Sequence, residues 1–298
     1  RQLTNNLIEF DSLEYPLFRI YFPKNSIPIL NQEKEKRAES PSWEIQHIPS
    51  EQAQRDRLRR ILHEEVPALL LSASHGVEFT PGSLQQRACQ GALLCQDWRG
   101  PGSGSPIPRD CYLAAEDILP NAQLHGLIAF LFACYSAGTP MVDSFTMGAQ
   151  RASRAPAAFV AALPQRMLVH PAGGALAVIG HIDRAWGYSF TGSSPVQRVH
   201  TAAIESTLRR LLHGERVGHA TEYLNLRYAE LACALSEELA AVRNLRQVDE
   251  RALAELWTAT HDARGYAVLG DPAVRIWSQP AADPAAAAAA VQESPCVS

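Results

Sequence analysis

The sequence predicts an α/β protein whose core is a doubly wound, mostly parallel sheet with helices on both faces. This prediction rests on three apolar runs, at residues 67–76, 127–138 and 175–182. None of them alternates between apolar and polar residues, which is typical of strands that are buried on both faces of a sheet. Helical patterns lie between and after these runs, as an α/β fold requires.

The remaining elements follow from periodicity, capping residues and turn residues. In chain order, they are a solvated charged loop at residues 32–37, a strand at 43–48, a helix at 52–65 that Ser50 caps, a hairpin or meander at 85–98, a flexible loop at 100–108, helices at 157–169, 195–212, 217–242 and 249–261, and a last strand at 266–277. Leu58, Ile61 and Leu62 form the apolar stripe expected for the first helix.

One large domain is expected to hold most of the chain, because 298 residues can bury a substantial core. We divide the chain into an N-terminal extension with the first elements (1–66), the core of the fold (67–277) and an Ala/Pro-rich tail or linker (278–298). The first residue is Arg1, with neither an initiator Met nor a signal-like apolar segment, which is typical of a fragment or a processed chain.

Composition narrows the classes of partner and cofactor. The formal net charge of −4 gives no reason to expect nucleic acid or an anionic membrane as a partner. No apolar run approaches the roughly 20 residues that span a bilayer. The six cysteines include no CxxC pair and no His cluster lies at zinc spacing, so we expect neither a metal nor another cofactor. Unpaired cysteines in a chain of this size indicate a cytoplasmic protein.

Two of the apolar runs end at a reactive side chain that a glycine follows closely. The first run ends at His75 and Gly76, and the second ends at Cys134, shortly before Gly138. Ligands and catalytic groups gather beyond the carboxyl ends of the strands in an open α/β sheet, so both side chains are expected at one cleft. We therefore interpret His75 and Cys134 as the catalytic pair of a cysteine hydrolase.

The chemistry of thiols supports this pairing. An ordinary thiol is only a few per cent ionised at neutral pH, so a cysteine nucleophile needs a base, and His75 can take that role. The oxyanion needs preorganised donors, for which the backbone N–H groups of Gly76 and Cys134 are the candidates. His125 and His181 are the alternative bases. His125 begins a strand at the opposite edge, whereas His181 lies near the end of the third run.

The third apolar run leads into the candidate substrate-binding residues, Asp183 and Trp186. The Asp183 carboxylate could receive a basic side chain of the substrate, or it could pair with Arg184 or another surface arginine. Trp186 could form the wall of a specificity pocket or pack in the core. Asp143 is a weaker candidate of the same kind as Asp183. Ser136 is not in a Gly-x-Ser-x-Gly elbow, so we do not interpret it as a nucleophile.

With these residues in hand, the chain resembles the caspase-like cysteine peptidases, most closely their bacterial gingipain-type and CHAT-type branch. The resemblance lies in residues 74–76, 132–140, 174–186 and 269–275, which together span about residues 67–277, most of the chain. It implies a caspase-like fold, His75 and Cys134 as the dyad, and hydrolysis of peptide bonds. Caspases place the histidine about 50 residues before the cysteine, and here the interval is 59 residues.

The resemblance has limits and leaves several functions open. Phe132 stands where the Gln-Ala-Cys-Arg-Gly signature of caspases has glutamine, and the arginines of their specificity pocket have no evident counterpart, so cleavage after aspartate does not carry over. Relatives of this branch often take part in bacterial defence or cell death under a fused or associated regulatory domain. A peptidase with a protein substrate is the leading interpretation. The alternatives are a catalytically silent scaffold that binds a partner protein, and a Cys–His hydrolase or acyltransferase of small amides.

Overall fold

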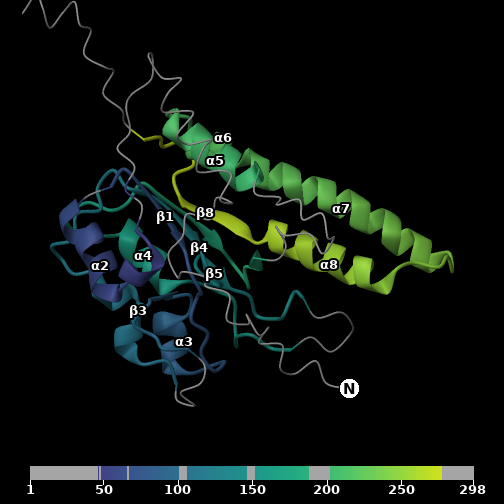
Figure 1. Ribbon diagram of the computed structural model, residues 1–298, viewed down its shortest axis with the longest axis horizontal. Coiled ribbons are helices and arrows are strands. Elements are labelled where there is room, and N and C mark those ends of the chain that lie inside the picture. The colour runs from purple at the N-terminus through teal and green to yellow at the C-terminus, as the bar shows by residue number, and fades with distance from the viewer. Residues whose placement is uncertain are drawn as a thin grey trace, which may run out of the picture.

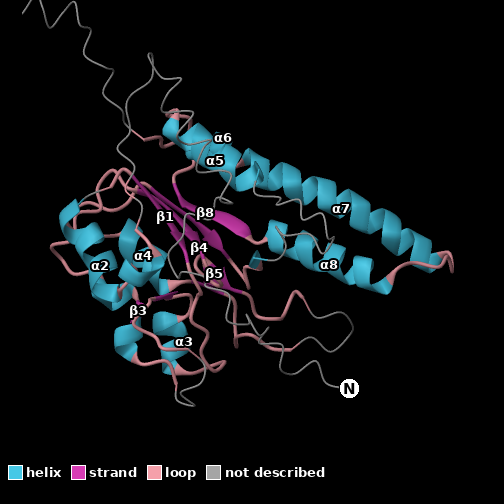
Figure 2. Ribbon diagram, viewed as in Figure 1, coloured by secondary structure: helices cyan, strands magenta, loops and turns pink. Residues whose placement is uncertain are grey.

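Four strands form the central sheet, in the order β1-β4-β7-β8 (Figure 2). They are β1 (Leu69–Ala73), β4 (Ile128–Phe132), β7 (Ala177–His181) and β8 (Tyr266–Gly270). β1, β4 and β7 are parallel, and β8 pairs with β7 in the antiparallel direction. This computed structural model describes residues 46, 48–65, 67–100, 106–145, 152–187 and 202–276. The three apolar runs are thus confirmed as strands of a mostly parallel sheet.

Residues along β4 alternate between two hydrophobic cores, one on each face of the sheet. Ala129 and Leu131 belong to one core, and Ile128 and Phe130 to the other, and all four are fully buried. The first core is covered by α2 (Arg55–Arg60) and α4 (Ala162–Leu168), and the second by α5 (Ala202–Leu212), α6 (Val217–Ala220) and α7 (Glu222–Arg243) (Figure 1). The expectation of helices on both faces is confirmed, and it explains why the strand sequences do not alternate.

A helical hairpin lies at one side of the sheet and extends beyond it (Figure 1). It consists of α7 and α8 (Glu250–Arg264), which pack along each other. The Asp249 carboxylate caps α8, because it accepts hydrogen bonds from the N–H groups of Arg251 and Ala252. Among the helices that the structure describes, none combines the length and the apolar composition that crossing a bilayer requires.

A smaller unit follows β1 in the chain and differs from its prediction. The prediction of a hairpin or meander at residues 85–98 is wrong: the chain first forms α3 (Leu84–Cys89), and then β2 (Leu93–Leu94) pairs with β3 (Tyr112–Leu113). α3 forms because the Ser83 hydroxyl accepts a hydrogen bond from the N–H of Gln86 and caps the helix. Of the glycine-rich loop expected at 100–108, residues 101–105 lie outside the described residues.

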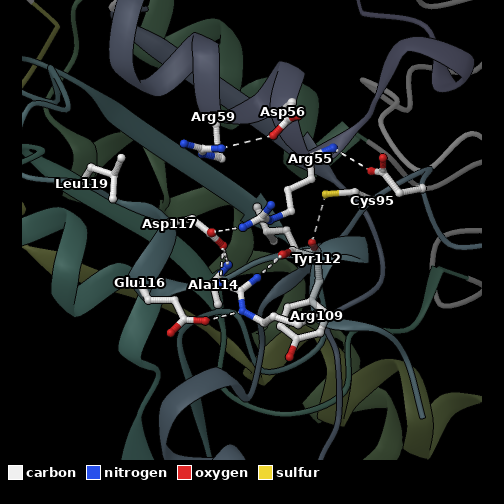
Figure 3. A network of polar contacts seen from close by, with 12 residues as sticks. Arg55, Asp56, Arg59, Cys95, Arg109, Tyr112, Ala114, Glu116, Asp117 and Leu119 are labelled. Carbon is white, nitrogen blue, oxygen red and sulfur yellow. Dashed lines mark hydrogen bonds and ion pairs between the residues drawn. The ribbon is translucent and has the colours of Figure 1, made fainter. Parts of the chain in front are cut away.

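A buried carboxylate ties this smaller unit to α2 (Figure 3). Asp117 ends the short helix η5 (Ala115–Asp117) and binds the guanidinium groups of Arg55 and Arg109. It also accepts the N–H of Ala114 at 2.8 Å. Burial alone would raise the pKa of Asp117, but the Ala114 N–H and the two guanidinium groups hold it below its ordinary value. The network is therefore a structural joint between three segments.

Other predicted elements differ in their bounds. The helix expected at 52–65 is divided into η1 (Ser50–Gln52), α2 and η2 (Ile61–Glu65), and its apolar stripe is buried as expected. The helix expected at 157–169 begins only at Ala162, because β6 (Phe159–Val160) pairs with β5 (Gly138–Thr139). The strand expected at 43–48, except for Gln46 and Ile48, and the tail at 278–298 lie outside the described residues.

Candidate active site

The first candidate residues, His75 and Cys134, follow the carboxyl ends of neighbouring parallel strands. The last paired residues of β1 and β4 are Ala73 and Phe132, and the N–H of Ser74 extends the ladder by donating to the Phe132 carbonyl at 3.1 Å. His75 and Cys134 each come two residues after the last pair. The structure therefore brings both residues to the same edge of the sheet, as the sequence predicted.

Gly76 brings the two strand ends into direct backbone contact. A Cβ atom at this position would lie 1.7 Å from the carbonyl oxygen of Cys134 and 2.9 Å from its nitrogen. Real Cβ atoms do not approach other heavy atoms this closely, so only glycine fits here without displacing the chain. The glycine after His75 is thus explained by the close approach of the backbone that carries the cysteine.

The chain turns sharply after Cys134. Tyr135 has a φ of 58°, a left-handed conformation that side chains rarely adopt, and it is fully buried. Its N–H donates to the Asp183 carbonyl at 2.8 Å, and its carbonyl passes so close to Gly91 that a Cβ there would lie 2.1 Å away. The Ser136 hydroxyl then links the turn to the sheet, since it donates to the Leu131 carbonyl at 2.7 Å. A strained backbone that several contacts hold in place is common beside a nucleophile.

The Cys134 thiol is protonated in this arrangement. It is partly exposed and donates a hydrogen bond to the Ala185 carbonyl at 3.6 Å, and not to His75. Burial raises the pKa of the thiol to about 11. The charge of Arg184 acts in the opposite direction, whereas the carboxylates of Glu78 and Asp262 raise the pKa further.

His75 presents a neutral ring at the sheet edge. Its side chain is exposed to solvent on one side, while surrounding protein atoms desolvate it and lower its pKa below the ordinary value. A neutral imidazole can accept a proton, so its ionisation state suits a general base. The backbone carbonyl of His75 accepts the N–H of Leu94 at 2.9 Å, which fixes the chain on the far side of the residue.

The two candidate oxyanion donors belong to backbone segments that contact each other. The Cys134 nitrogen lies 2.9 Å from the position that a Cβ of residue 76 would take. In the described part of the chain, neither the Gly76 N–H nor the Cys134 N–H donates a hydrogen bond. N–H groups that are not used by the fold are what an oxyanion hole requires.

Asp183 is buried and is not neutralised by its neighbour. Its Oδ1 accepts the backbone N–H of Arg184 at 2.8 Å, but the Arg184 guanidinium pairs with Asp143, at 2.5 Å. The alternative in which Arg184 pairs with Asp183 is therefore wrong. The side chain of Asp183 is 3% exposed, and its Oδ2 has no hydrogen-bond partner within the described residues. A buried acceptor without a partner is unusual in a stable fold.

Trp186 packs against Phe145, with the ring centroids 5.8 Å apart, and its backbone N–H donates to Asp262 Oδ1 at 2.7 Å. Phe145 also contacts the ring of His261, at 6.1 Å. Trp186 is half-buried, so it is neither a core residue nor a free surface residue. It forms one side of an aromatic cluster beside the loop that follows β7.

Asp143 was the weaker substrate-binding candidate, but its ion pairs were not predicted. Asp143 binds both Arg154 and Arg184, and Arg154 continues to Glu78, three residues after His75. Burial would raise the pKa of Asp143, but the hydrogen bond from Arg154, a backbone N–H and the charges of both arginines hold it below its ordinary value. The sequence contains no motif for this chain of ion pairs, because its members come from three separate segments.

The two alternative bases, His181 and His125, lie at different places in the fold. His181 is fully buried, and its ring nitrogens lie 2.9 and 2.8 Å from the backbone oxygens of Asp183 and Asp262. It packs so tightly on Gly265 that a Cβ there would lie 2.1 Å from the ring. His125 lies before β4, at the opposite edge of the sheet, as expected. The ring of His181 is therefore committed to backbone contacts in the core.

No family model matches this chain, and no curated protein or solved structure is significantly similar to it. Among the described residues, no group of three or more His, Cys, Asp or Glu side chains is arranged to hold a metal ion.

Proposed function

We propose that this chain is a caspase-like cysteine endopeptidase that cleaves a protein substrate through His75 and Cys134. The observation that supports the proposal most directly is the contact between Gly76 and the Cys134 backbone, at the carboxyl ends of two parallel strands. Parallel strands deliver their following residues to one edge, so a base and a nucleophile lie there together.

The proposed reaction follows from the groups at this edge. His75 accepts the proton of the Cys134 thiol, and the thiolate attacks the carbonyl carbon of the scissile peptide bond. The N–H groups of Gly76 and Cys134 stabilise the oxyanion that forms. His75 then donates the proton to the leaving amine, and water hydrolyses the acyl-enzyme with His75 again acting as the base.

Asp183 and Trp186 are the proposed substrate-binding residues. Within the described residues, the carboxylate of Asp183 keeps a buried oxygen without a partner, and the cluster of Trp186 and Phe145 supplies an apolar wall. A buried carboxylate is stabilised by an opposite charge, so we propose that the P1 residue is Arg or Lys.

The resemblance to caspase-like peptidases suggests a cytoplasmic enzyme of bacterial defence or cell death. The proposed partners are a protein substrate and a fused or associated regulatory domain, without nucleic acid or membrane. A metal or another cofactor has no role in this mechanism.

One observation favours a second candidate, a catalytically silent scaffold that binds a partner protein. The Cys134 thiol donates its hydrogen bond to the Ala185 carbonyl and not to His75. The pKa of this thiol is raised, whereas an activated cysteine has a lowered pKa. A scaffold would keep this arrangement permanently, but a peptidase would change it before turnover.

Proteome-wide identification of new N-termini distinguishes the two candidates. We expect wild type to generate new termini, Cys134→Ala to generate none, and His75→Ala to lower the cleavage rate by about 10²–10⁴-fold, the loss typical of removing a general base. Cys233→Ala and His125→Ala are matched controls at exposed positions away from the site, and both should cleave normally. Cleavage by Cys134→Ala at the wild-type rate would disprove the dyad.

A further inference from the structure

The backbone carbonyl of Ala185 accepts a hydrogen bond from the thiol of Cys134. The sulfur lies 3.6 Å from the Ala185 carbonyl oxygen and donates its hydrogen bond there. Within the described part of the chain, the thiol makes no other hydrogen bond. A thiol that is held by a backbone acceptor does not present its proton to His75.

The segment that carries this carbonyl, Arg184–Trp186, is anchored at both ends by buried carboxylates. At one end, the Arg184 guanidinium lies 2.5 Å from Asp143 Oδ1. At the other end, the Trp186 N–H lies 2.7 Å from Asp262 Oδ1. The side chains of Asp143 and Asp262 are 4% and 0% exposed, so solvent competes weakly with either contact. Two fixed points on either side of Ala185 hold its carbonyl over the sulfur.

Aromatic rings reinforce the anchor at Arg184. The guanidinium lies over the rings of Phe145 and Trp186, at 5.0 and 5.2 Å from their centroids. These distances are within the range of cation–π attraction. Arg184 therefore connects the segment to Asp143, Phe145 and Trp186 at once, and it is the residue whose removal releases the segment most directly.

We propose that Arg184–Trp186 is a latch that keeps the Cys134 thiol in a resting, unreactive state and opens when the Arg184–Asp143 ion pair breaks. The latch regulates the proposed peptidase, so its biological role rests on the proposed function. Its chemical effect on the thiol does not, because any reagent that needs the thiolate reports it. Opening the latch hydrates the sulfur and frees its proton for transfer to His75.

The charge of Arg184 and its proposed role in the latch predict opposite changes in the reactivity of the thiol. The titratable groups that act on Cys134 are Glu78, Tyr135, Arg184, Asp262 and Tyr266. Of these, Arg184 is the cation, and its charge favours the thiolate. If Arg184 acted only through its charge, removing it would make the thiol less reactive. If it holds the latch, removing it makes the thiol more reactive.

The rate at which iodoacetamide alkylates Cys134 in Arg184→Met distinguishes these two roles. The thiolate attacks the methylene carbon, iodide leaves, and the thiol proton goes to solvent, so the rate follows the thiolate fraction. We expect Cys134 to react about tenfold faster than in wild type at pH 7.5. A pKa that falls by about two units gives roughly 100-fold more thiolate, and the lower basicity of that thiolate removes about tenfold. Peptide mass spectrometry resolves Cys134 from the other cysteines, and the exposed Cys233 is the internal reference.

Arg154→Met is the matched control, because it removes the other guanidinium on Asp143 and leaves the Arg184 contact in place. Its Cys134 should react no faster than that of wild type. Phe145→Ala is the second variant in case Arg184→Met does not fold, as judged by circular dichroism. It loosens the same segment without changing a charge, and we expect it to accelerate alkylation as well.

Three results would overturn the latch: an unchanged or slower rate in folded Arg184→Met, an equal acceleration in Arg154→Met, or a wild-type Cys134 as reactive as Cys233. A separate outcome concerns the proposed function. If alkylation accelerates in Arg184→Met but no protein is cleaved by any variant, the latch stands and the peptidase proposal fails.

Discussion

At the scale of single residues, close backbone contacts explain the glycines around the site better than turn conformations do. Gly76 has no left-handed φ, but the Cys134 carbonyl occupies the space where its Cβ would lie. Gly91 combines a φ of 77° with a similarly close approach of the Tyr135 carbonyl. Both glycines allow the strained turn after Cys134 to sit directly on neighbouring chain segments.

Gly76→Ala should therefore displace the backbone of Cys134. We expect a loss of stability of about 1–3 kcal/mol, the usual cost of overpacking, and a loss of any activity that depends on Cys134. Urea denaturation and the alkylation rate of Cys134 measure the two effects. Gly187→Ala is the control, since a Cβ there would meet no described atom within 4 Å. Equal stability of the two variants would contradict the steric account of Gly76.

The carboxylate of Asp183 allows a direct test of substrate preference. If it receives a basic P1 side chain, Asp183→Asn should lower cleavage after Arg and Lys by at least tenfold and leave cleavage at other residues unchanged, because an amide cannot compensate a buried cation. The measurement is the P1 profile of a peptide library with wild type and the variant. An identical profile in both would show that Asp183 is structural.

The position of Arg184 shows what sequence reasoning lacks at this scale. Adjacency made Arg184 one possible partner of Asp183, but its guanidinium binds Asp143, 41 residues away, which Arg154 also binds. A long side chain chooses among all carboxylates that the fold brings within its reach. The sequence alone does not show which carboxylates those are. The contact between Asp262 and Trp186 could not be predicted for the same reason, because these residues lie 76 positions apart.

At the scale of elements, burial decides which parts of the fold can be predicted. β4 and β7 are buried on both faces, so their sequences are apolar without interruption and easily recognised. α3 was mistaken for a hairpin because only Gln86 of its six residues is buried, so no apolar stripe marks the helix. Its start is marked only by the capping hydroxyl of Ser83. The start of α4 was misplaced because pairing with β5 depends on a distant segment.

The turn between α7 and α8 contains an unfavourable residue that can be improved. Leu245 follows α7 with a φ of 55° and is 95% exposed, whereas glycine is the usual residue at such a position. We expect Leu245→Gly to stabilise the protein by roughly 1 kcal/mol, because it removes the left-handed penalty and loses no burial. Thermal denaturation measures the gain. Leu245→Ala keeps the penalty and should not stabilise, so an equal gain in both variants would refute this explanation.

At the scale of the whole molecule, the described residues form three hydrophobic cores, and two buried carboxylates connect segments that are distant in the chain. The cores on the two faces of the sheet and the third core, around β2 and β3, are separate clusters. Asp117 joins α2 to the smaller unit, and Asp143 joins the segment after β5 to the loop after β7. The apolar cores could be predicted from hydrophobic patterns. The joints could not, because each pairs an acid with arginines from other segments.

The ion pairs of Asp117 and Asp143 should make the stability of the fold depend on pH. The pKa values of Asp117 and Asp143 are lowered in the folded state, so both carboxylates contribute stability above the pKa of an unfolded aspartate, and this contribution is lost as the pH falls through the folded values. We expect urea denaturation to show a marked loss of stability from about pH 4 downward. In Asp117→Asn, the stability at pH 7 should be lower by roughly 1–3 kcal/mol, since the partner arginines remain partly exposed to water. The decline between pH 4 and pH 2 should also be shallower than in wild type, because the variant has one carboxylate fewer to protonate. A decline as steep as that of wild type would mean that Asp117 does not couple folding to proton binding.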